Sequence, residues 1–344
     1  MSSTDTLAVR ELKCYFRQRG AGRIGTQRTV RAVDGVSFSI PPATTLGLVG
    51  ESGCGKSTLA RAVLRLHKPE SGSVYLAGTD ITSLSERELR RGPRRRMQMI
   101  FQDPDHSLNP RKRVGEILSQ PLKVHATVAP QKRRRHCEAL LEQVGLDASM
   151  LDRFPHEFSG GQKQRIGIAR ALALEPQLIV ADEPVSALDV SVQAQILRLM
   201  RDLQARLKLS YLFISHDLGV VRYIADTVAV MYLGRIVEMA PRDNLFAVPK
   251  HPYTVALLSA IPEPVARAEN RGIRSRIMLP GEMPNPANPP GGCPFHTRCP
   301  IARDRCRVEA PPLVTDEAGH SVACHFPGEL TATGRSRPTA SMNA

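Results

Sequence analysis

A glycine-rich loop between an apolar run and a helix-forming segment is the feature that most restricts the fold. The segment GESGCGKST, residues 50–58, fits the pattern G-x-x-x-x-G-K-[ST]. It follows the short apolar run TLGLV at 45–49 and opens the segment KSTLARAVLRL. Such a loop turns tightly at its glycines, so its backbone N–H groups and the helix N-terminus face one point. A chance glycine turn lacks this strand–loop–helix context, so the loop predicts a phosphate-binding site.

The residues of this loop have separate predicted roles in holding a nucleotide. Lys56 brings a positive charge to the β- and γ-phosphates, Ser57 offers a hydroxyl to Mg²⁺, and Thr58 supports the α-phosphate. The predicted phosphate-binding set is Gly50, Ser52, Gly53, Gly55, Lys56, Ser57 and Thr58.

Polar side chains follow three further apolar runs, where strands of a parallel sheet would end. Asp182, the last residue of LIVAD, is predicted to hold Mg²⁺, and Glu183 is predicted to activate the attacking water as general base. Gln102 follows MQMIF and suits Mg²⁺ or the water, while His216 follows YLFIS and can contact the γ-phosphate. Each of these residues alone would be ordinary polar surface, but downstream of a phosphate loop they indicate a hydrolytic site.

The pattern of strands and helices predicts an α/β fold. The apolar runs at 45–49, 97–101, 178–182 and 211–215 are typical of parallel strands that helices cover on both faces. The alternating segments LAVRELKCYF and RTVRAVDGVSFSI predict flanking antiparallel strands. The stretch from about 104 to 176 has helical spacing and predicts an inserted helical subdomain.

Charge and composition restrict the partners. The chain has 47 Lys and Arg against 33 Asp and Glu, a net charge of +14, which suits anionic partners. Its basic clusters at 87–96 and 131–135 are more often exposed faces than nucleic-acid sites. Aromatic residues are only 4% and Trp is absent, which argues against a base-stacking surface. No apolar run approaches the ~18 residues of a membrane span, and the N-terminus lacks a secretory core. We therefore expect a cytoplasmic chain unless a partner holds it at a membrane.

A second glycine-rich loop, FSGGQKQR at 158–165, is unexplained by a single nucleotide site. Together with GESGCGKST, Gln102, LIVADEPVSALD and ISHD, it resembles the ATPase subunit of an ABC transporter over about 250 residues. The resemblance implies an ABC cassette in which two subunits pack head to tail, so that each SGGQ loop completes the partner's ATP site. Ser159, Gly160, Gly161 and Gln162 would then offer a second helix N-terminus to the γ-phosphate.

The resemblance also implies roles outside the two loops. Asp189 would lie at the dimer seam, and His216 would be the switch histidine. An aromatic side chain near the N-terminus would stack on adenine: Phe16 fits by spacing, with Tyr15 as the alternative. Phe158 stands where the family often has Leu, and we expect no loss of activity from this change.

A finer resemblance, to importers of oligopeptides and dipeptides, rests on FQDPDHSLNPR, HPYTVALLSAIP and GCPFHTRCP. It implies a second, homologous ATPase as heterodimer partner, two transmembrane permeases, an external solute-binding protein and a peripheral location on the cytoplasmic face of the plasma membrane. Nickel, glutathione or another small solute are alternative cargoes. A soluble ABC ATPase acting on ribosomes or DNA is the alternative of another class, although we expect no direct nucleic-acid binding.

The composition changes near residue 261, so we predict three regions: an ATPase domain at 1–260, a Pro/Gly/Cys-rich region at 261–330 and a disordered tail at 331–344. Four cysteines of the middle region are separated by more than the tight pairs usual for zinc. Their spacing suits a [4Fe–4S] cluster, which the resemblance also implies for some members, with zinc, free thiols or a disulfide as alternatives. His296 and His325 could replace a ligand. The predicted ligands are Cys293, Cys299, Cys306 and Cys324, whereas Cys14, Cys54 and Cys137 are expected to have no special role.

Overall fold

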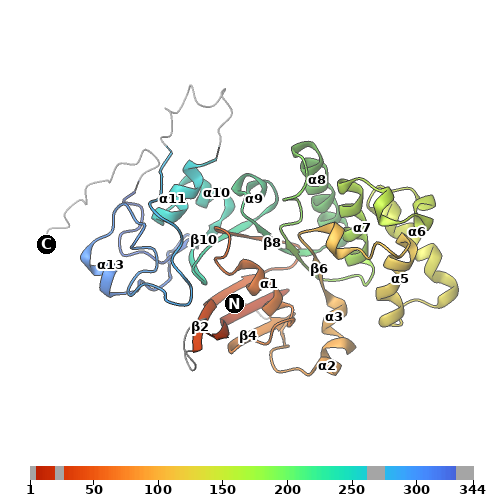
Figure 1. Ribbon diagram of the computed structural model, residues 1–344, viewed down its shortest axis with the longest axis horizontal. Coiled ribbons are helices and arrows are strands. Elements are labelled where there is room, and N and C mark those ends of the chain that lie inside the picture. The colour runs from red at the N-terminus through yellow and green to blue at the C-terminus, as the bar shows by residue number, and fades with distance from the viewer. Residues whose placement is uncertain (1–4, 20–26, 262–275, 331–344) are drawn as a thin grey trace. The chain divides into compact units, whose positions relative to one another are not determined.

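The computed structural model describes residues 5–19, 27–261 and 276–330 (Figure 1). Two compact units make up the chain, and the backbone passes between them several times. The first unit comprises Met1–Arg10, Ser37–Leu46 and Ala60–Ser215, and the second comprises Glu11–Val36, Gly47–Leu59 and His216–Ala344. The predicted boundary at 260 stays a prediction, and the predicted tail at 331–344 lies outside the described residues.

A parallel sheet forms the centre of the first unit. Strand β7 (Leu178–Asp182) pairs in parallel with β6 (Met97–Ile100) on one side and β8 (Ser210–Ser215) on the other. Every residue of β7 and β8 is buried. Strands buried on both faces need apolar side chains at every position, which explains their continuous apolar sequences. The three strands predicted at 97–101, 178–182 and 211–215 are confirmed to within one residue.

Helices make up most of the remainder of this unit. The stretch predicted to be helical contains α4 (Pro104–Ser107), α5 (Val114–Val124), α6 (Arg133–Gln143) and α7 (Gly160–Leu172). In Figure 1, α5, α6 and α7 lie beside one another, and each contacts the other two. The long helix α8 (Val190–Leu207) also contacts α7. The amphipathic sequence of α5 buries Val114, Ile117, Leu118 and Leu122 in this group.

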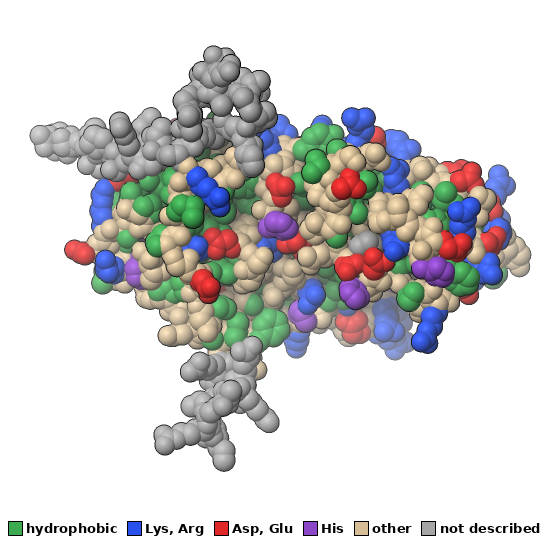
Figure 2. Space-filling view, turned by 45° about the horizontal axis from the view of Figure 1, so that its top comes forward, with side chains coloured by type: hydrophobic (Ala, Val, Ile, Leu, Met, Phe, Trp, Pro, Cys, Tyr) green, Lys and Arg blue, Asp and Glu red, His purple; other side chains and the backbone are tan. Residues whose placement is uncertain are grey.

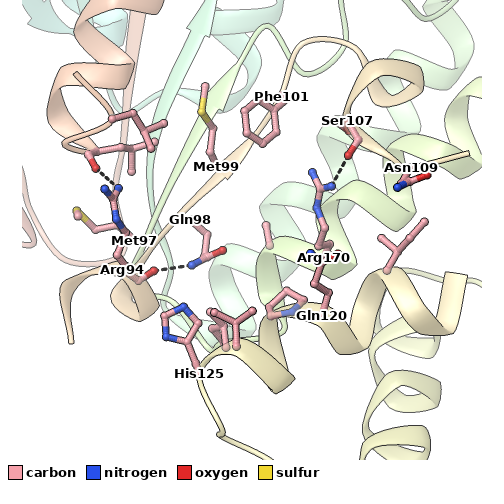
Figure 3. A pocket seen from close by; sticks show the side chains of 17 residues that line it. Arg94, Met97, Gln98, Met99, Phe101, Ser107, Asn109, Gln120, His125 and Arg170 are labelled. Carbon is pink, nitrogen blue, oxygen red and sulfur yellow. Dashed lines mark hydrogen bonds between the residues drawn. The ribbon is translucent and has the colours of Figure 1, made fainter. Parts of the chain in front are cut away.

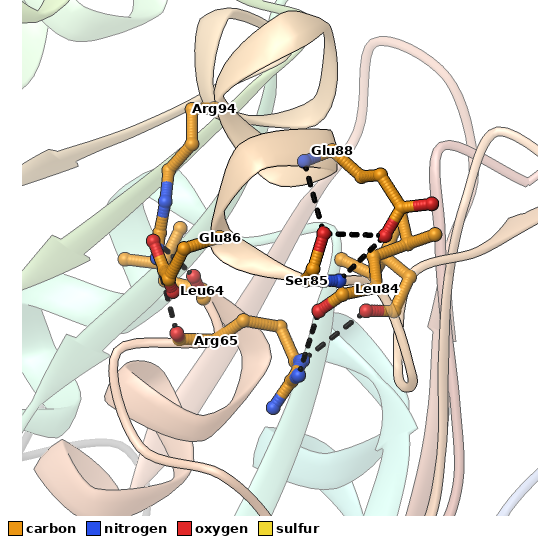
Figure 4. A network of polar contacts seen from close by, with 8 residues as sticks. Leu64, Arg65, Leu84, Ser85, Glu86, Glu88 and Arg94 are labelled. Carbon is orange, nitrogen blue, oxygen red and sulfur yellow. Dashed lines mark hydrogen bonds and ion pairs between the residues drawn. The ribbon is translucent and has the colours of Figure 1, made fainter.

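A polar network fixes the short helices before β6 (Figure 4). Ser85 and Glu88 form a capping box at the start of α2 (Glu86–Arg91), which satisfies two helix N–H groups. Arg94, in α3 (Pro93–Arg96), donates to the carbonyl oxygens of Leu64 and Arg65 and pairs with Glu86. Part of the basic cluster at 87–96 therefore joins segments of this unit. On the face drawn in Figure 2, Lys and Arg side chains are interspersed with acidic ones.

An antiparallel sheet has the order β2-β1-β4-β5, with β1 at Leu7–Arg19, β2 at Gln27–Ile40, β4 at Ser71–Leu76 and β5 at Thr79–Asp80. Strand β4 pairs antiparallel with β5. The N–H of Thr6 donates to Ile40 O at 2.9 Å, and Thr6 O accepts from the N–H of Ala77 at 2.9 Å. The alternating segments of the sequence are thus strands, as predicted.

The second unit contains the rest of the chain. Its antiparallel strands run in the order β9-β10-β12-β11, at Thr227–Tyr232, Arg235–Pro241, Ser321–Val322 and Val314–Thr315. Its helices are α9 (Leu218–Ile224), α10 (Arg242–Ala247), α11 (Pro252–Ser259) and α13 (Asp304–Val308). Strand β3 (Thr45–Val49) and helix α1 (Lys56–Val63) each belong partly to both units.

A buried carboxylate anchors the C-terminal region in this unit. Glu238, on β10, is fully buried and accepts hydrogen bonds from the N–H groups of Lys250 and His251 and from His320 Nε2. His251 Nδ1 in turn accepts from the N–H of Tyr253 and caps α11. Because a buried carboxylate is costly without partners, the C-terminal strands and α11 are fastened to β10 at this point.

We predict that His251 makes folding stability depend on pH. Burial lowers the pKa of His251 from 6.5 to about 4, so between these values the unfolded chain takes up a proton that the folded chain does not. The stabilisation is complete above pH 6.5 and falls by up to about 3 kcal/mol as the pH drops to 4. Denaturant unfolding at several pH values measures this loss.

The control for this experiment is His251→Asn, which keeps a capping oxygen but does not titrate. The difference in unfolding free energy between wild type and His251→Asn should change with pH over this window. For exposed His156, the variant His156→Asn should follow the wild-type curve. A difference for His251→Asn that does not vary with pH would contradict the prediction.

Candidate functional site

The phosphate loop of the second unit has the close packing that its glycines allow. Gly55 has a φ of +110°, and a Cβ at this position would lie 2.0 Å from the carbonyl oxygen of Ala32. Lys56 is buried, and its Nζ donates to the carbonyl oxygens of Gly50 at 2.7 Å and Glu51 at 3.0 Å. The ammonium group is thus held inside the loop at the start of α1.

The other predicted phosphate-binding residues are close to Lys56 in the sequence. Ser52 and Gly53 are exposed, whereas Ser57 and Thr58 are half-buried in the first turn of α1. The first N–H groups of a helix have no partner within the helix, so this end of α1 favours an anion. The phosphate loop can therefore hold phosphate groups by backbone donors and one cation.

The predicted acidic residues lie at the end of β7 in the first unit. Asp182 is its last residue and is only 5% exposed. Glu183 follows with a φ of +48°, and its N–H donates to Ile214 O at 3.0 Å. A non-glycine residue in the left-handed region costs about 1–3 kcal/mol and is held by its surroundings. The backbone turns sharply at Glu183, directly after β7 ends at Asp182.

Gln102 lies beside Glu183. Its Nε2 donates to Glu183 Oε2 at 3.1 Å, although the two residues are 81 positions apart in sequence. The structure therefore brings together the predicted base and the residue predicted to suit Mg²⁺ or the attacking water. A buried carboxylate next to an exposed amide–carboxylate pair can hold a hard cation and orient a water molecule.

The remaining predicted nucleotide residues are distributed over both units. His216 is exposed, directly after β8 and before Asp217, the N-cap of α9. Asp189 caps α8 by accepting from the N–H of Val192 at 2.9 Å. Phe16 is 37% exposed on β1. The Tyr15 hydroxyl, by contrast, donates to Asp34 at 2.6 Å.

The SGGQ loop forms the N-terminus of α7. Ser159 and Gln162 form a capping box: Ser159 Oγ accepts from the N–H of Gln162, and the Gln162 side chain accepts from the N–H of Ser159. The N–H groups of Gly160 and Gly161 lie between these two and belong to the end of the helix, where no intrahelical acceptor exists. A Cβ at Gly161 would lie 2.5 Å from Val192 on α8, so only glycine fits this packing. Ser159 and Gly160 are exposed, so the helix end faces outward.

The four C-terminal cysteines approach one another in the second unit. Cys293 and Cys306 are buried, and the N–H of Cys293 donates to Cys306 O at 2.9 Å. The pKa of Cys324 is raised to about 12, chiefly by burial and to a smaller extent by the neighbouring Cys299, Cys293 and Cys306. Within residues 5–19, 27–261 and 276–330, however, no three His, Cys, Asp or Glu side chains have the arrangement of a single metal-ion site. The predicted ligands are thus neighbouring thiols without the geometry of a bound ion.

A groove in the first unit is lined in part by Phe101, the residue before Gln102. It has a volume of about 420 Å³ and is lined by residues of β6, α5 and α7 (Figure 3). Arg170 crosses it to donate to Ser107 O at 2.5 Å, and Gln98 donates to Arg94 O at 2.6 Å. Phe101 is 43% exposed at its edge. These residues come from separate segments without a motif, so the sequence held no signal for them.

Comparisons with known proteins agree with this site. Residues 33–186 match the family model "ABC transporter", and residues 237–306 match "Oligopeptide/dipeptide transporter, C-terminal region". The oligopeptide transport ATP-binding protein AppF of Bacillus subtilis is 53% identical over 320 residues, covering 93% of this chain and 97% of that protein. The chain belongs to the ABC transporter ATP-binding proteins.

Other matches support the same assignment. The probable peptide ABC transporter ATP-binding protein y4tS of Sinorhizobium fredii is 57% identical, covering 86% of this chain and 82% of that protein. The dimeric post-hydrolysis structure of the ATP-binding cassette MJ0796 has a TM-score of 0.60 and 26% identity, covering 69% of this chain and 98% of that one. The predicted α/β ABC cassette is confirmed, and the chain is an ATPase. Among the described residues, no helix has the length and apolar character needed to span a membrane.

We predict that Glu183→Gln retains ATP binding and loses hydrolysis. The amide keeps the size and the contact with Gln102 but cannot accept a proton, so turnover should fall by about 10²–10⁴-fold. Steady-state ATPase assays and a nucleotide-binding measurement on the same preparation test this.

Glu175→Gln is the matched control, because Glu175 is a glutamate of the same unit that also has a left-handed backbone, φ +52°. This variant should turn over at the wild-type rate. Wild-type turnover by Glu183→Gln would remove Glu183 as the base.

Proposed function

We propose that this chain hydrolyses ATP to power the import of peptides through partner permeases in the plasma membrane. The observation that carries the proposal is the joining of an ABC ATPase region to an oligopeptide/dipeptide transporter C-terminal region in one chain. Relatives named as oligopeptide or peptide transport ATP-binding proteins match along nearly the whole chain. Nickel, glutathione and other small solutes are the alternative cargoes.

The catalytic roles proposed from the sequence fit the geometry of each unit. Lys56 and the N-terminus of α1 bind the triphosphate, and Glu183, oriented by Gln102, accepts a proton from the attacking water. The buried Asp182 carboxylate and the Ser57 hydroxyl are oxygen donors of the kind that hold Mg²⁺, with the Gln102 side-chain oxygen as a further ligand. When bound, Mg²⁺ would neutralise charge on the phosphate oxygens.

The outward-facing SGGQ loop supports pairing with a second ATPase. In this proposal the N–H groups of Gly160 and Gly161 meet the γ-phosphate held by the partner's phosphate loop. Asp189, at the nearby start of α8, would lie at the seam, and Phe16 would stack on adenine. ATP binding would favour the paired state, and hydrolysis would release it.

The groove beside Gln102 supports docking of a permease. It combines apolar side chains, such as Val124 at 69% exposure, with the half-buried Arg170, whose pKa is lowered by partial burial. A short amphipathic segment of a permease would place its apolar face there. Docking would hold the ATPase on the cytoplasmic face of the membrane, and an external solute-binding protein would deliver the peptide.

We predict ATP-dependent uptake of labelled peptides by proteoliposomes that contain the chain with its second ATPase, both permeases and the binding protein. Replacing this chain by Glu183→Gln should abolish uptake. Uptake of nickel or glutathione but not of any peptide would contradict the peptide assignment.

In the same assay Val124→Glu should lower uptake, because it places a charge in the groove that the permease would fill. Its basal ATPase activity without permeases should be unchanged. Val308→Glu is the control, since Val308 is 82% exposed and lies in the other unit. Full uptake by Val124→Glu would argue against docking in this groove.

The C-terminal thiols support a proposal of their own, a [4Fe–4S] cluster, with zinc as the alternative. Four neighbouring thiols in a Pro- and Gly-rich framework fit thiolate ligation, and Cys299, whose pKa is raised to about 11 by burial, would have to lose its proton on binding. A cluster spreads its ligands further apart than one ion does.

We predict that the full chain, purified without oxygen, contains iron and absorbs visible light. Replacing Cys299 and Cys324 by Ser should remove both signals, whereas Cys137→Ser should keep them. Stoichiometric zinc without iron would support the alternative, and a colourless preparation free of both metals would exclude metal binding.

A further inference from the structure

The phosphate loop is in direct contact with the C-terminal region within the second unit. Glu51, the second residue of the loop, accepts a hydrogen bond at Oε2 from Arg298 Nη1 at 2.8 Å. Its backbone N–H donates to the Tyr253 hydroxyl at 2.9 Å. Arg298 is only 7% exposed, and its Nε donates to Pro280 O at 3.2 Å. Tyr253 and Arg298 both lie in residues 237–306, the segment that matches the transporter C-terminal region, and they hold one loop residue by its backbone and by its carboxylate.

Packing behind these contacts makes them rigid. The rings of Tyr253, Tyr232 and Phe295 contact one another with centroids 4.8–5.4 Å apart, and all three side chains are buried. The same Phe295 contacts His251, which Glu238 fastens to β10. Such aromatic pairs prefer the edge and tilted arrangements seen here. Arg298 follows Phe295 by three residues, so its guanidinium is presented to Glu51 from a fixed base.

The charge of Glu51 makes this contact important for the nucleotide. Glu51 follows Gly50 directly, and the carbonyl oxygens of both residues accept from Lys56 Nζ. A Glu51 carboxylate without a counter-charge would repel the triphosphate, because like charges that are close together in a partly buried site interact strongly. An ion pair with Arg298 neutralises Glu51 and keeps its carboxylate on the side of the loop that faces the C-terminal region.

We propose that Arg298, with Tyr253, is a positioning residue of the ATP site, through which the C-terminal region sets the affinity of the phosphate loop for ATP. This role rests on ATP binding alone and does not depend on the identity of the transported solute. Arg298 lies between Cys293 and Cys299 in the sequence, so the thiol-rich segment is connected to the phosphate loop by one side chain.

The test is the dissociation constant of the full chain for Mg²⁺–AMP-PNP, measured by titration calorimetry. Arg298→Gln should raise it about tenfold, because Glu51 then faces the phosphates without its counter-charge. The double variant Glu51→Gln with Arg298→Gln should return to within about twofold of wild type, since the repulsion is gone. Added salt should reduce the difference in dissociation constant between Arg298→Gln and wild type, because salt screens the repulsion.

Arg303→Gln is the matched control. Arg303 lies in the same segment and pairs with Glu329, but it is half exposed and does not contact the phosphate loop. The affinity of Arg303→Gln for Mg²⁺–AMP-PNP should equal that of wild type. Should Arg298→Gln not fold, Glu51→Gln alone still tests the proposal: it removes a negative charge and leaves Arg298 in place, so binding should tighten or stay unchanged.

Three results would overturn the proposal. Wild-type affinity of a folded Arg298→Gln would show that the ion pair does not affect the nucleotide. If Arg298→Gln and the double variant bind Mg²⁺–AMP-PNP equally weakly, Arg298 maintains the structure and does not act by neutralising the charge of Glu51. Weaker binding by Glu51→Gln alone would contradict it as well.

Discussion

The interaction on which this protein depends is the one between a triphosphate and the unsatisfied N–H groups at helix N-termini. Each helix begins with donors that have no partner inside the helix, and glycine allows them to approach an anion closely. Two such beginnings carry the glycines of the predicted phosphate contacts, at Lys56 and at Gly160. At the first, Lys56 Nζ is held inside the phosphate loop, whereas at the second Lys163 pairs with Asp105, and Ser159 and Gly160 are exposed. The second is therefore suited to complete a site on another subunit.

Local packing explains why these two helix ends keep their shapes. At Gly55 a side chain would collide with the backbone of Ala32, and at Gly161 it would collide with Val192. The capping box of Ser159 and Gln162 uses its own side chains to satisfy two N–H groups, which leaves the glycine N–H groups for a ligand. The phosphate loop is held through Glu51, so the segment that matches the oligopeptide/dipeptide transporter C-terminal region contacts the segment that matches the ABC transporter family.

Much of this could be predicted from the sequence, because the relevant signals are local. Continuous apolar runs predicted buried strands, and the strand–loop–helix pattern predicted the phosphate loop. The acids at 182 and 183 stand out because they follow such a strand. The left-handed backbone of Glu183 had no signal, because any residue type other than glycine disfavours it. The contact of Arg298 with Glu51 joins residues 247 positions apart, and no sequence motif links the two residues. The groove beside Gln102 is built in the same way from distant segments.

Hydrogen exchange of the backbone amides tests the central claim most directly. The sample is the assembled complex containing Glu183→Gln, compared with and without saturating Mg²⁺–ATP. If two helix ends from two subunits enclose one triphosphate, the nucleotide slows exchange both in residues 50–57 and in residues 159–162 of this chain. Slower exchange in the phosphate loop, with residues 159–162 exchanging as fast as before, would contradict the account.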